Sequence, residues 1–514
     1  MDHDDQREAT AFLDRPETYG DAVSAVERID THAAMIFLAG DRAYKLKRAV
    51  RFSYLDFSTL ERREAVCRAE LVFNKRTAPD LYLGVRSITR EADGSCAFDG
   101  AGTIIDWVVV MRRFDQNLLF DRMAERGTLD DELMEQLSAE VARFHAAAAE
   151  PTPGHGGRAS IEIEIEGNDE NLALAPPDAF PRELRSALIR RWRTELDRHS
   201  ALLDRRDEDG KVRRCHGDLH LRNICLWNDR PTLFDCIEFS EHLACIDVLY
   251  DLAFLLMDLL HRGLGRFANL IFNAYLDRND ETEGTAALPL MMSLRAAIRA
   301  HTGIAAARAQ THPERQREMV EEARRYLSLA NRLLHDEQPR LIAIGGVSGT
   351  GKSTLARALA PEIGASPGAR LVHTDALRKR LFGVAKTERL DDEAYKPEVS
   401  ERVYRLQREV AAASLRSGYS VIVDGVFARP EERVAIADIA RDCVTAFAGL
   451  WLTAPEKILR ARVTGRTADM SDATVDMLEM QLLTDAGTID WTKVDSGESL
   501  EDAVASARTA LTTR

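Results

Sequence analysis

Apolar and polar positions alternate in short runs through the first 113 residues, a pattern typical of strands joined by tight turns. Residues 34–47 turn at Gly40-Asp41, and residues 104–111 form an apolar run that predicts a buried strand. Between them we expect a helix from Ser58, because Ser58 and Glu61 have the spacing of a capping box. The first part of the chain is therefore expected to form a small, strand-rich lobe.

Helical spacing of apolar residues dominates after this lobe, from residue 129 to about residue 263. It returns in two long stretches at residues 294–310 and 313–334. Within the helical part, residues 161–166 alternate apolar and acidic side chains, which predicts an exposed strand there. The pattern otherwise predicts a lobe built from helices.

A polar break at residues 335–339 ends in a proline and separates two patterns. After it, short apolar strands alternate with helical stretches, at residues 340–344, 371–373, 421–423 and 448–452. That alternation predicts a parallel sheet covered by helices. The expected organisation is an α+β domain over residues 1–337, with a small lobe over about 1–113 and a helical lobe over about 114–337, followed by an α/β domain over residues 338–514.

Charge and composition narrow the classes of partner. The net charge is −15, and residues 1–337 hold 45 Lys and Arg against 59 Asp and Glu, a balance of −14. This acidity argues against nucleic-acid binding and favours either a cationic substrate or simple solubility. No apolar run approaches the roughly 20 residues that cross a bilayer, the N-terminus lacks an apolar signal segment, and the seven cysteines have no Cys-x-x-Cys spacing. We expect a cytoplasmic protein that binds neither nucleic acid nor membranes.

The segment Cys-His-Gly-Asp-Leu-His-Leu-Arg-Asn, which ends at Asn223, has polar groups at the spacing of a phosphoryl-transfer loop. Asp218 stands where a carboxylate would accept or orient the proton of an attacking hydroxyl. Asn223 follows five positions later and Asp235 ends the next apolar stretch, so their oxygens suit Mg²⁺. His216 is expected to brace the loop through hydrogen bonds rather than to act as a base. The ordered combination predicts a nucleotide site.

An upstream strand supplies candidates for a phosphate clamp. Lys45 and Lys47 lie on one face of this strand, and either could reach the α- and β-phosphates of ATP. Such a lysine needs a carboxylate from a helix to hold it. Glu70 lies on an apolar helical face, whereas Glu64 faces Arg68 and should be exposed. We therefore predict that Lys45 pairs with Glu70.

A glycine-rich turn forms a second constellation between an expected strand and an expected helix. Its sequence, Gly-Val-Ser-Gly-Thr-Gly-Lys-Ser, is a complete Walker A pattern in the structural context that such a pattern requires. Backbone N–H groups would cradle phosphates, Lys352 would reach the β- and γ-phosphates, and the Ser353 hydroxyl suits Mg²⁺. Asp424 ends a later strand in a setting that suits a magnesium-bound water. The predicted nucleotide-binding residues are Gly346, Val347, Ser348, Gly349, Thr350, Gly351, Lys352, Ser353 and Thr354.

Two further features of the C-terminal region are less specific. Asp375 follows a short apolar strand, where it either caps a helix or faces an acceptor hydroxyl. The helix after residue 455 bears Arg460, Arg462 and Arg466. These arginines form either a solvated basic surface or a lid that brings positive charge to transferring phosphates.

The His-Gly-Asp-x-x-x-x-Asn loop, the following aspartate and the Ala-Tyr-Lys strand resemble the aminoglycoside phosphotransferase family, a branch of the protein-kinase-like fold. The resemblance covers about residues 31–334 and implies a bilobal kinase that phosphorylates a small-molecule hydroxyl. The implied roles are catalytic base for Asp218, Mg²⁺ ligands for Asn223 and Asp235, and ATP clamp for Lys45. In contrast to protein kinases, residues 36–43 hold only Gly40 and form no glycine-rich loop. The fold hosts many acceptors, so the resemblance does not name one.

Residues 340–510 resemble the small P-loop kinases that include gluconate kinase, polynucleotide kinases and zeta-toxin-type kinases. This resemblance implies that Asp375 is the acceptor-site carboxylate and that Arg462 and Arg466 are lid arginines. The whole chain thus looks like an aminoglycoside-phosphotransferase-like domain fused to a P-loop kinase.

The leading interpretation is a bifunctional ATP-dependent phosphotransferase that uses ATP and Mg²⁺ and acts on hydroxyl groups of two small molecules. An alternative is a single kinase whose other domain is a regulatory ATP sensor. A nucleic-acid end kinase would need a basic groove, and residues 338–514 hold 24 Lys and Arg against 25 Asp and Glu. A protein kinase would need an activation segment, and no obvious equivalent follows Asp235 in the first domain. The acceptors and the oligomeric state stay open.

Overall fold

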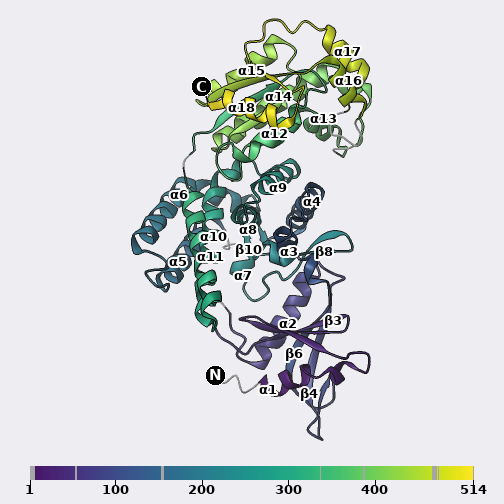
Figure 1. The fold of residues 1–514 in the computed structure, drawn as a ribbon. Coiled ribbons are helices and arrows are strands. Elements are labelled where there is room, and N and C mark those ends of the chain that lie inside the picture. Colours follow the sequence, from purple (N-terminus) through teal and green to yellow (C-terminus); the bar gives the residue numbers. More distant parts are fainter. Residues whose placement is uncertain are drawn as a thin grey trace. The chain divides into compact units, whose positions relative to one another are not determined.

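The computed structural model describes residues 6–52, 55–151, 156–335, 337–385, 388–465, 472 and 474–512. The chain, which can be followed in Figure 1, divides into two compact units. The first contains Met1–Arg262 and Leu294–Ala330, and the second contains Gly263–Ser293 and Asn331–Arg514. The domain boundary expected at residue 337 stays a prediction.

A six-stranded antiparallel sheet forms the N-terminal lobe of the first unit, in the order β1-β2-β3-β6-β4-β5. Its strands are β1 (Val26–Asp30), β2 (Ala34–Ala39), β3 (Arg42–Lys47), β4 (Tyr82–Arg90), β5 (Cys96–Phe98) and β6 (Thr103–Arg112). Lys45 of β3 pairs with Ile36 of β2 and with Val109 of β6, so it lies inside the sheet. The strands expected over residues 34–47 and 104–111 are confirmed.

Helices α1 (Arg7–Leu13) and α2 (Leu60–Asn74) cover opposite faces of this sheet. Because side chains alternate along a strand, Tyr44 packs in the cluster with α1 while Lys45 and Lys47 reach a carboxylate of α2. Helix α2 confirms the helix that was expected from Ser58. Its cap is Thr59, whose hydroxyl accepts a hydrogen bond from the third following N–H group.

Helices dominate the rest of the first unit, as their periodicity predicts. They are α3 (Phe120–Glu125), α4 (Asp131–Ala147), α5 (Gly157–Ala173), α6 (Arg182–Glu208), α7 (Glu241–Ala244), α8 (Val248–His261), most of α10 (Leu288–Ala309) and α11 (Pro313–Arg332). Two short antiparallel pairs interrupt them: β7 (Val212–Arg214) with β10 (Cys245–Asp247), and β8 (Ile224–Trp227) with β9 (Arg230–Leu233). Every helix among the described residues is too short or too polar to span a bilayer.

The strand expected over residues 161–166 is wrong, because this segment lies inside α5. Ile161 and Ile165 are buried, while Ile163 is exposed. Residues four positions apart lie on one face of a helix, so two of the three isoleucines face the protein and the third faces solvent. A stretch this short fits both periods, and the helical contacts of α5 with α6 decide between them.

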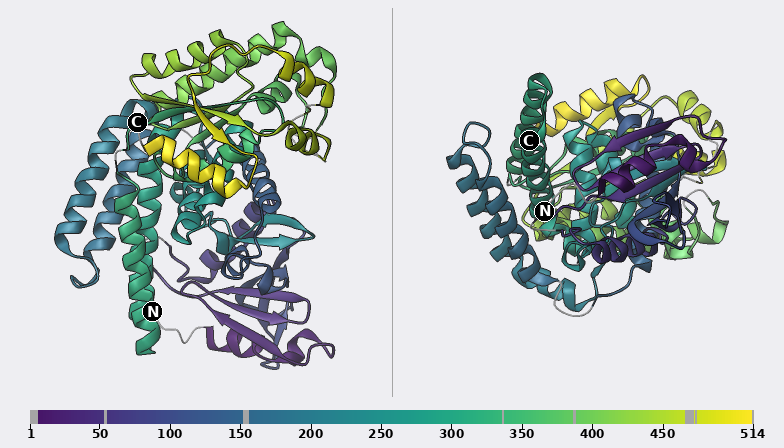
Figure 2. Two further views of the ribbon diagram at one scale, coloured as in Figure 1. Left: turned by 45° about the horizontal axis from the view of Figure 1, so that its top comes forward. Right: turned by 90° about the horizontal axis from the view of Figure 1, so that it is seen from below.

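A five-stranded parallel sheet forms the centre of the second unit, in the order β12-β13-β11-β14-β15. Its strands are β11 (Arg340–Gly345), β12 (Arg370–His373), β13 (Val421–Asp424), β14 (Ala446–Thr453) and β15 (Thr492–Asp495). Its helices are α12 (Lys352–Leu359), α13 (Thr374–Phe382), α14 (Pro397–Arg416), α15 (Pro430–Asp442), α16 (Glu456–Thr464), α17 (Val475–Leu483) and α18 (Leu500–Thr512). Figure 2 shows α18, the last helix, against the sheet, where it shares an apolar cluster with α12. Four expected strands are confirmed, and β15 is a fifth.

Helix α9 (Gly265–Arg278), which precedes the short 3-10 helix η5 (Glu283–Ala287), belongs to the second unit and lies against the edge strand β12. Asn273 Nδ2 donates to Ala369 O at 3.1 Å, and Asn273 Oδ1 accepts from the N–H of Leu371 at 2.7 Å. Arg370 binds both Asn273 Oδ1 at 3.0 Å and Asp277 Oδ1 at 2.7 Å. The side-chain amide of Asn273 thus forms the hydrogen bonds that a neighbouring strand would form with β12. This edge of the sheet is therefore covered.

Replacing Asn273 by alanine should destabilise the second unit by about 2–4 kcal/mol, because buried backbone groups and a guanidinium lose their partner. Amide hydrogen exchange at Leu371 should accelerate, and the midpoint of thermal unfolding should fall. Asn279→Ala, just beyond the end of the same helix, is the control and should change neither quantity. Unaltered protection of Leu371 in Asn273→Ala would contradict this account of α9.

Candidate active sites

The loop between β7 and β8 is bound by two aspartates of α8. Asp251 accepts hydrogen bonds from the N–H groups of His216 at 3.0 Å and Gly217 at 2.9 Å. Two turns further along the helix, Asp258 accepts from the N–H of Leu221 at 3.0 Å. Both carboxylates are buried, and they satisfy loop amides that no strand pairs. Sequence reasoning missed both residues, although acidic side chains inside an otherwise apolar helix were a visible signal.

His216 and Gly217 fix the shape of this loop. Gly217 has φ of +82°, and a Cβ there would lie 2.8 Å from Leu243 O, so glycine is required. His216 Nε2 lies 2.9 Å from Phe234 O, and Nδ1 accepts from the N–H of Asp218 at 3.3 Å. These contacts need a neutral ring that carries its proton on Nε2, and burial lowers the pKa of His216. His216 therefore braces the loop, as expected.

Asp218 and Asn223 come together at the end of the loop. Asn223 Nδ2 donates to both the backbone O and Oδ2 of Asp218 at 2.9 Å, so the side-chain oxygen of Asn223 points away from Asp218. His220 Nε2 lies 3.4 Å from Asp218 Oδ2. Burial acts to raise the pKa of Asp218, but the neighbouring His220 and the charge of Arg299 outweigh it, and the pKa lies below its ordinary value. Asp218 is thus ionised at neutral pH and able to accept a hydroxyl proton.

Lys45 and Lys47 share one buried carboxylate. Lys45 Nζ lies 2.8 Å from Glu70 Oε1, and Lys47 Nζ lies 2.6 Å from Glu70 Oε2. Each ammonium has a second partner, Asp235 for Lys45 and Glu238 for Lys47, both at 2.5 Å. Burial acts to lower the pKa of Lys45, but these carboxylates outweigh it and raise that pKa. The expected pair of Lys45 with Glu70 is present, and Glu238 is a member of the cluster that sequence reasoning missed.

Asp235 follows β9 in the left-handed region, with φ of 61°. Its N–H donates to Tyr82 Oη at 3.2 Å, and the next N–H, of Cys236, donates to Asn74 Oδ1 at 2.9 Å. These contacts hold a backbone conformation that non-glycine residues rarely adopt. The carboxylate is 41% exposed, so it is accessible from solvent. Carboxylate and amide oxygens from Asp235 and Asn223 fit a hard divalent cation.

The turn between β1 and β2 places His32 within electrostatic reach of Asp218 and Asp235. Partial burial lowers the pKa of His32, and these two charges act in the opposite direction. The absence of a glycine-rich loop was inferred from residues 36–43, but that segment is the second strand and the turn after it. The turn that approaches the site consists of residues 31–33, Thr-His-Ala, which also lacks glycine.

Glu70→Gln should reduce turnover at this site at least tenfold, because Lys45 and Lys47 lose the carboxylate that holds them. It should also lower the free energy of unfolding by about 3 kcal/mol, the order expected for a broken buried pair. Glu64→Gln on the same helix removes only an exposed pair with Arg68 and should cost under about 0.5 kcal/mol. Steady-state kinetics corrected for the folded fraction would separate the two effects. Equal activities of the two variants would contradict the clamp.

The second site lies where β11 runs through a glycine-rich turn into α12. Gly346, Gly349 and Gly351 have φ of 138°, 85° and 83°. A Cβ at Gly346 would lie 2.6 Å from Leu452 O, and one at Gly349 would lie 2.9 Å from Leu459 O. Only glycine fits this turn, which presents backbone N–H groups at the start of a helix. Lys352 Nζ donates to Val347 O at 3.0 Å, so the lysine side chain lies folded over the turn.

Ser353, which follows this turn, is in direct contact with Asp424. Both residues were predicted to lie near a magnesium ion, so this contact is compatible with the prediction. Ser353 Oγ donates to Asp424 Oδ2 at 2.6 Å, and His373 Nδ1 lies 2.9 Å from the same oxygen. Burial acts to raise the pKa of Asp424, but His373 outweighs it and the pKa lies below its ordinary value. Gln407 of α14 donates to Asp424 O at 2.8 Å and to Val372 O at 2.9 Å, which ties the ends of β13 and β12 together. His373 and Gln407 were missed by sequence reasoning.

Asp375 and the arginines occupy different surroundings. Asp375 is the second residue of α13, so it does not hold the cap position. Burial raises the pKa of Tyr395 and of Tyr404, and the charge of Asp375 adds to both shifts. Asp375 therefore lies within electrostatic reach of these two tyrosines. Arg462 donates to Ser496 O at 2.8 Å and approaches the carbonyl of Gly349 at 3.5 Å, so it contacts the glycine-rich turn. Arg460 pairs with Glu456 and Glu479, and Arg466 lies outside the described residues.

Asp424→Asn should raise the Mg²⁺ concentration that half-saturates the second site at least tenfold, the order seen when metal-site carboxylates are altered. The reason is that the asparagine side chain would still accept the hydrogen bond from Ser353 but would lack the negative charge of Asp424. The measurement is metal-dependent turnover that is abolished by Lys352→Ala. Asp442→Asn at the exposed end of α15 is the control. An unchanged metal requirement in Asp424→Asn would exclude a role for this carboxylate in metal binding.

Comparison with known protein families matches both regions. Residues 105–288 match a family described as a phosphotransferase enzyme family, and residues 341–484 match a family described as an AAA domain. Both are kinase-type domains, which confirms the two resemblances and the expected fold classes. The protein is an ATP-dependent phosphotransferase, and enzymes of these families generally need a divalent metal.

Relatives extend over nearly the whole chain. Uncharacterized proteins of Mycobacterium tuberculosis and Mycobacterium bovis are 31% identical over 486 residues, which cover 92% of this chain and 92% of theirs. A choline/ethanolamine kinase family protein from Mesorhizobium loti matches 63% of this chain and 99% of its own, with 14% identity and a TM-score of 0.39. A gluconokinase from Sinorhizobium meliloti matches 34% of this chain and 97% of its own, with 25% identity and a TM-score of 0.24.

Proposed function

We propose that this chain, which belongs to the same family as these mycobacterial proteins, is a bifunctional phosphotransferase. Each domain transfers the γ-phosphate of ATP to a hydroxyl group of a small molecule. The observation that supports this proposal is the presence of two separate sets of phosphate-facing and metal-facing groups. One is built around Asp218 and Lys45, the other around Lys352 and Asp424.

At the first site, Asp218 orients the acceptor hydroxyl and receives its proton as the oxygen attacks phosphorus. Lys45, held by Glu70, binds phosphate oxygens and fixes the nucleotide relative to the loop. Asn223 and Asp235 would hold Mg²⁺, and the bound Mg²⁺–ATP supplies the phosphoryl group and offsets its charge. The bond from the γ-phosphorus to the bridging oxygen breaks as the bond to the acceptor oxygen forms, and ADP leaves.

At the second site, the N–H groups of residues 346–354 bind phosphate oxygens at the start of α12. Lys352 would reach the β- and γ-phosphates, while Ser353 and Asp424 would hold Mg²⁺ directly or through water. Asp375 would face the acceptor hydroxyl. Arg462, and Arg466 after it in the chain, would supply positive charge near the transferring group.

The acceptors are proposed to be small molecules rather than nucleic acids. Residues 1–337 carry a balance of −14, and residues 338–514 carry a balance of −1, so neither region offers the excess of positive charge that a phosphate backbone needs.

ADP release should be measured from Mg²⁺–ATP against a panel of aminoglycosides, sugars, sugar nucleotides and nucleosides. Asp218→Ala should reduce turnover of one set of acceptors at least a hundredfold, because the base that receives the proton is absent. Lys352→Ala should reduce turnover of a different set, because the lysine that reaches the β- and γ-phosphates is absent. A direct assay of phosphorylated product would identify each acceptor class.

The two variants serve as controls for each other, because each leaves the other site intact. Loss of the same acceptor in both variants would overturn the bifunctional proposal and favour one kinase regulated by an ATP-sensing domain. Full turnover in Asp218→Ala with every acceptor would exclude the first site as a kinase.

A further inference from the structure

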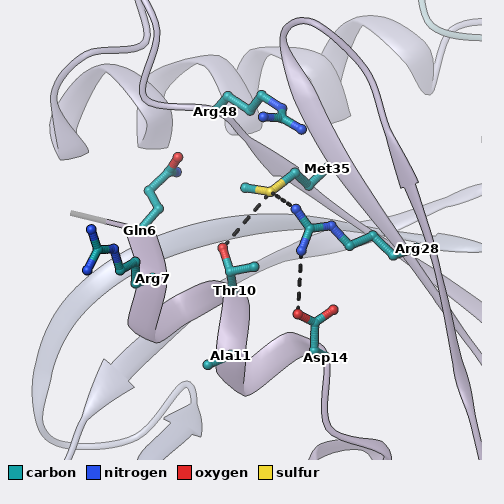
Figure 3. Close-up of a pocket in the computed structure, with 8 residues that line it drawn as sticks. All are labelled: Gln6, Arg7, Thr10, Ala11, Asp14, Arg28, Met35 and Arg48. Carbon is teal, nitrogen blue, oxygen red and sulfur yellow. Dashed lines mark hydrogen bonds and ion pairs between the residues drawn. The ribbon is translucent and has the colours of Figure 1, made fainter. Parts of the chain in front are cut away.

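The surface pocket beside α1 lies within the first unit and is lined by arginines (Figure 3). Arg28 pairs with Asp14 and Asp30, and Arg48 pairs with Asp30. Carboxylates of the protein itself therefore bind these two guanidinium groups. The glycine-rich turn of the second unit differs, because one of its backbone N–H groups is bound by a side chain from a distant helix.

That side chain is Gln481, near the end of α17. Its Oε1 accepts a hydrogen bond from the N–H of Ser348 at 2.7 Å. Ser348 is buried and is the third residue of the turn, before α12 begins at Lys352. Gln481 therefore holds the backbone of the turn directly, although it lies 133 positions further along the chain.

Helices α16 and α17 pack against the turn together. Leu478 of α17 shares an apolar cluster with Leu459 and Val463 of α16. Val347 of the turn packs against that cluster. A Cβ at Gly349 would lie 2.9 Å from Leu459 O and 3.2 Å from a methyl carbon of Val463, so the turn lies directly against α16. Apolar packing thus brings both helices to the turn, and the carboxamide hydrogen bond fixes its backbone there.

The donors that suit phosphate follow Ser348 in the chain. The first helical hydrogen bond of α12 runs from the N–H of Leu355 to Gly351 O at 2.9 Å. The N–H groups of residues 351–354 therefore precede the helical ladder and lie at the start of the helix, where phosphate oxygens bind. Nucleotide can use these groups while the N–H of Ser348 keeps its bond to Gln481.

The chain enters α17 after a residue that is bound to α13, the helix that carries Asp375. Asp472, three positions before α17, accepts from Tyr395 Oη at 2.8 Å and from the N–H of Leu390 at 3.1 Å. The other oxygen of Asp472 lies 3.1 Å from Nζ of the buried Lys379. Lys379 lies four positions after Asp375, so the two share one face of α13. The segment that contains α17 thus connects the phosphate turn to α13.

We propose that Gln481 is a positioning residue of the second site, which orders the glycine-rich turn for phosphate and makes nucleotide binding depend on the placement of α17. This inference rests on the proposed use of ATP at that site. With the contact in place, part of the turn is ordered before phosphate binds. Without it, the N–H of Ser348 loses its acceptor, and ordering the turn reduces the free energy that is gained on binding.

The contact is tested by hydrogen exchange on the full chain, resolved to the single amide of Ser348. Gln481→Met has a similar length but lacks the acceptor oxygen, so exchange at Ser348 without nucleotide should accelerate at least tenfold. Gln481→Glu keeps an acceptor oxygen, and exchange should stay slow. Equal exchange in Gln481→Met and in the unaltered chain would overturn the contact. Exchange in β11 and β14 shows whether each variant is folded.

Nucleotide binding is measured as the AMP-PNP concentration that half-protects residues 346–354 from exchange in saturating Mg²⁺, a readout that reports on the second site alone. Gln481→Met should raise this concentration at least tenfold, because the turn is no longer ordered beforehand. Glu479→Gln on the same helix removes only an exposed pair with Arg460 and should leave the concentration unchanged.

An unchanged concentration in Gln481→Met would overturn the inference. A lower one would also overturn it, because Gln481 would then compete with phosphate for the N–H of Ser348. Absence of protection in the unaltered chain is a different failure. It would overturn nucleotide binding at the second site, and with it both the proposed function of this site and the inference.

Dependence on α17 is tested with Tyr395→Phe, which removes a donor to Asp472. This change should raise the half-protecting concentration at least threefold, and it should have no further effect in Gln481→Met, because both changes act through α17. Tyr419→Phe, which removes a similar hydrogen bond to Ser366 O, is the control and should have no effect. Additive effects of Tyr395→Phe and Gln481→Met would overturn the dependence on α17.

Discussion

Both loops that form the candidate sites are irregular backbone, and buried side chains rather than neighbouring strands satisfy their polar groups. Asp251 accepts two successive N–H groups before Asp218, and Gln407 donates to the carbonyl of Asp424. Leaving such groups unpaired would cost about 1–3 kcal/mol each. The direction of Asp218, and the contact of Asp424 with Ser353, depend on these buried partners. The geometry of each candidate site is therefore set by buried residues outside the set that is expected to contact the substrate.

The lysine cluster solves a different problem, that of burying charge. Asp235, Lys45, Glu70, Lys47 and Glu238 alternate in sign, so each ammonium lies between two carboxylates and the desolvation of each ion is offset by its neighbours. Three carboxylates face two ammonium groups, and the accessible member is Asp235. The surplus of negative charge thus lies at the end where the metal would bind, beside Asp218. The cluster favours a divalent cation there without leaving an isolated charge inside the protein.

The sequence predicted most of the fold and most of the side chains that come together at the two candidate sites, because these follow from local spacing. The Walker turn, the strands around Lys45 and the loop that ends at Asn223 are all patterns within about ten residues. The supporting residues were missed because they lie far away: Asp251 is more than 30 positions from the loop that it binds, and Gln407 is 17 positions from Asp424. Only folding reveals such pairs. The alternation at residues 161–166 led to the wrong prediction of a strand. A stretch this short fits both the strand period and the helix period until its packing partner is known.

The point at which the chain leaves the first unit for the second lies between two helices that support the two candidate sites. Helix α8, which carries Asp251 and Asp258, ends at His261, and α9 begins at Gly265 in the other unit. There Asn273 completes the edge of the sheet whose next strand ends in Asp424. A cut near residue 337, where the sequence pattern changes, would remove this helix from the sheet and expose the backbone of β12. The kinase-type domains therefore share a segment, and the stability of the second depends on residues that precede it by more than 60 positions.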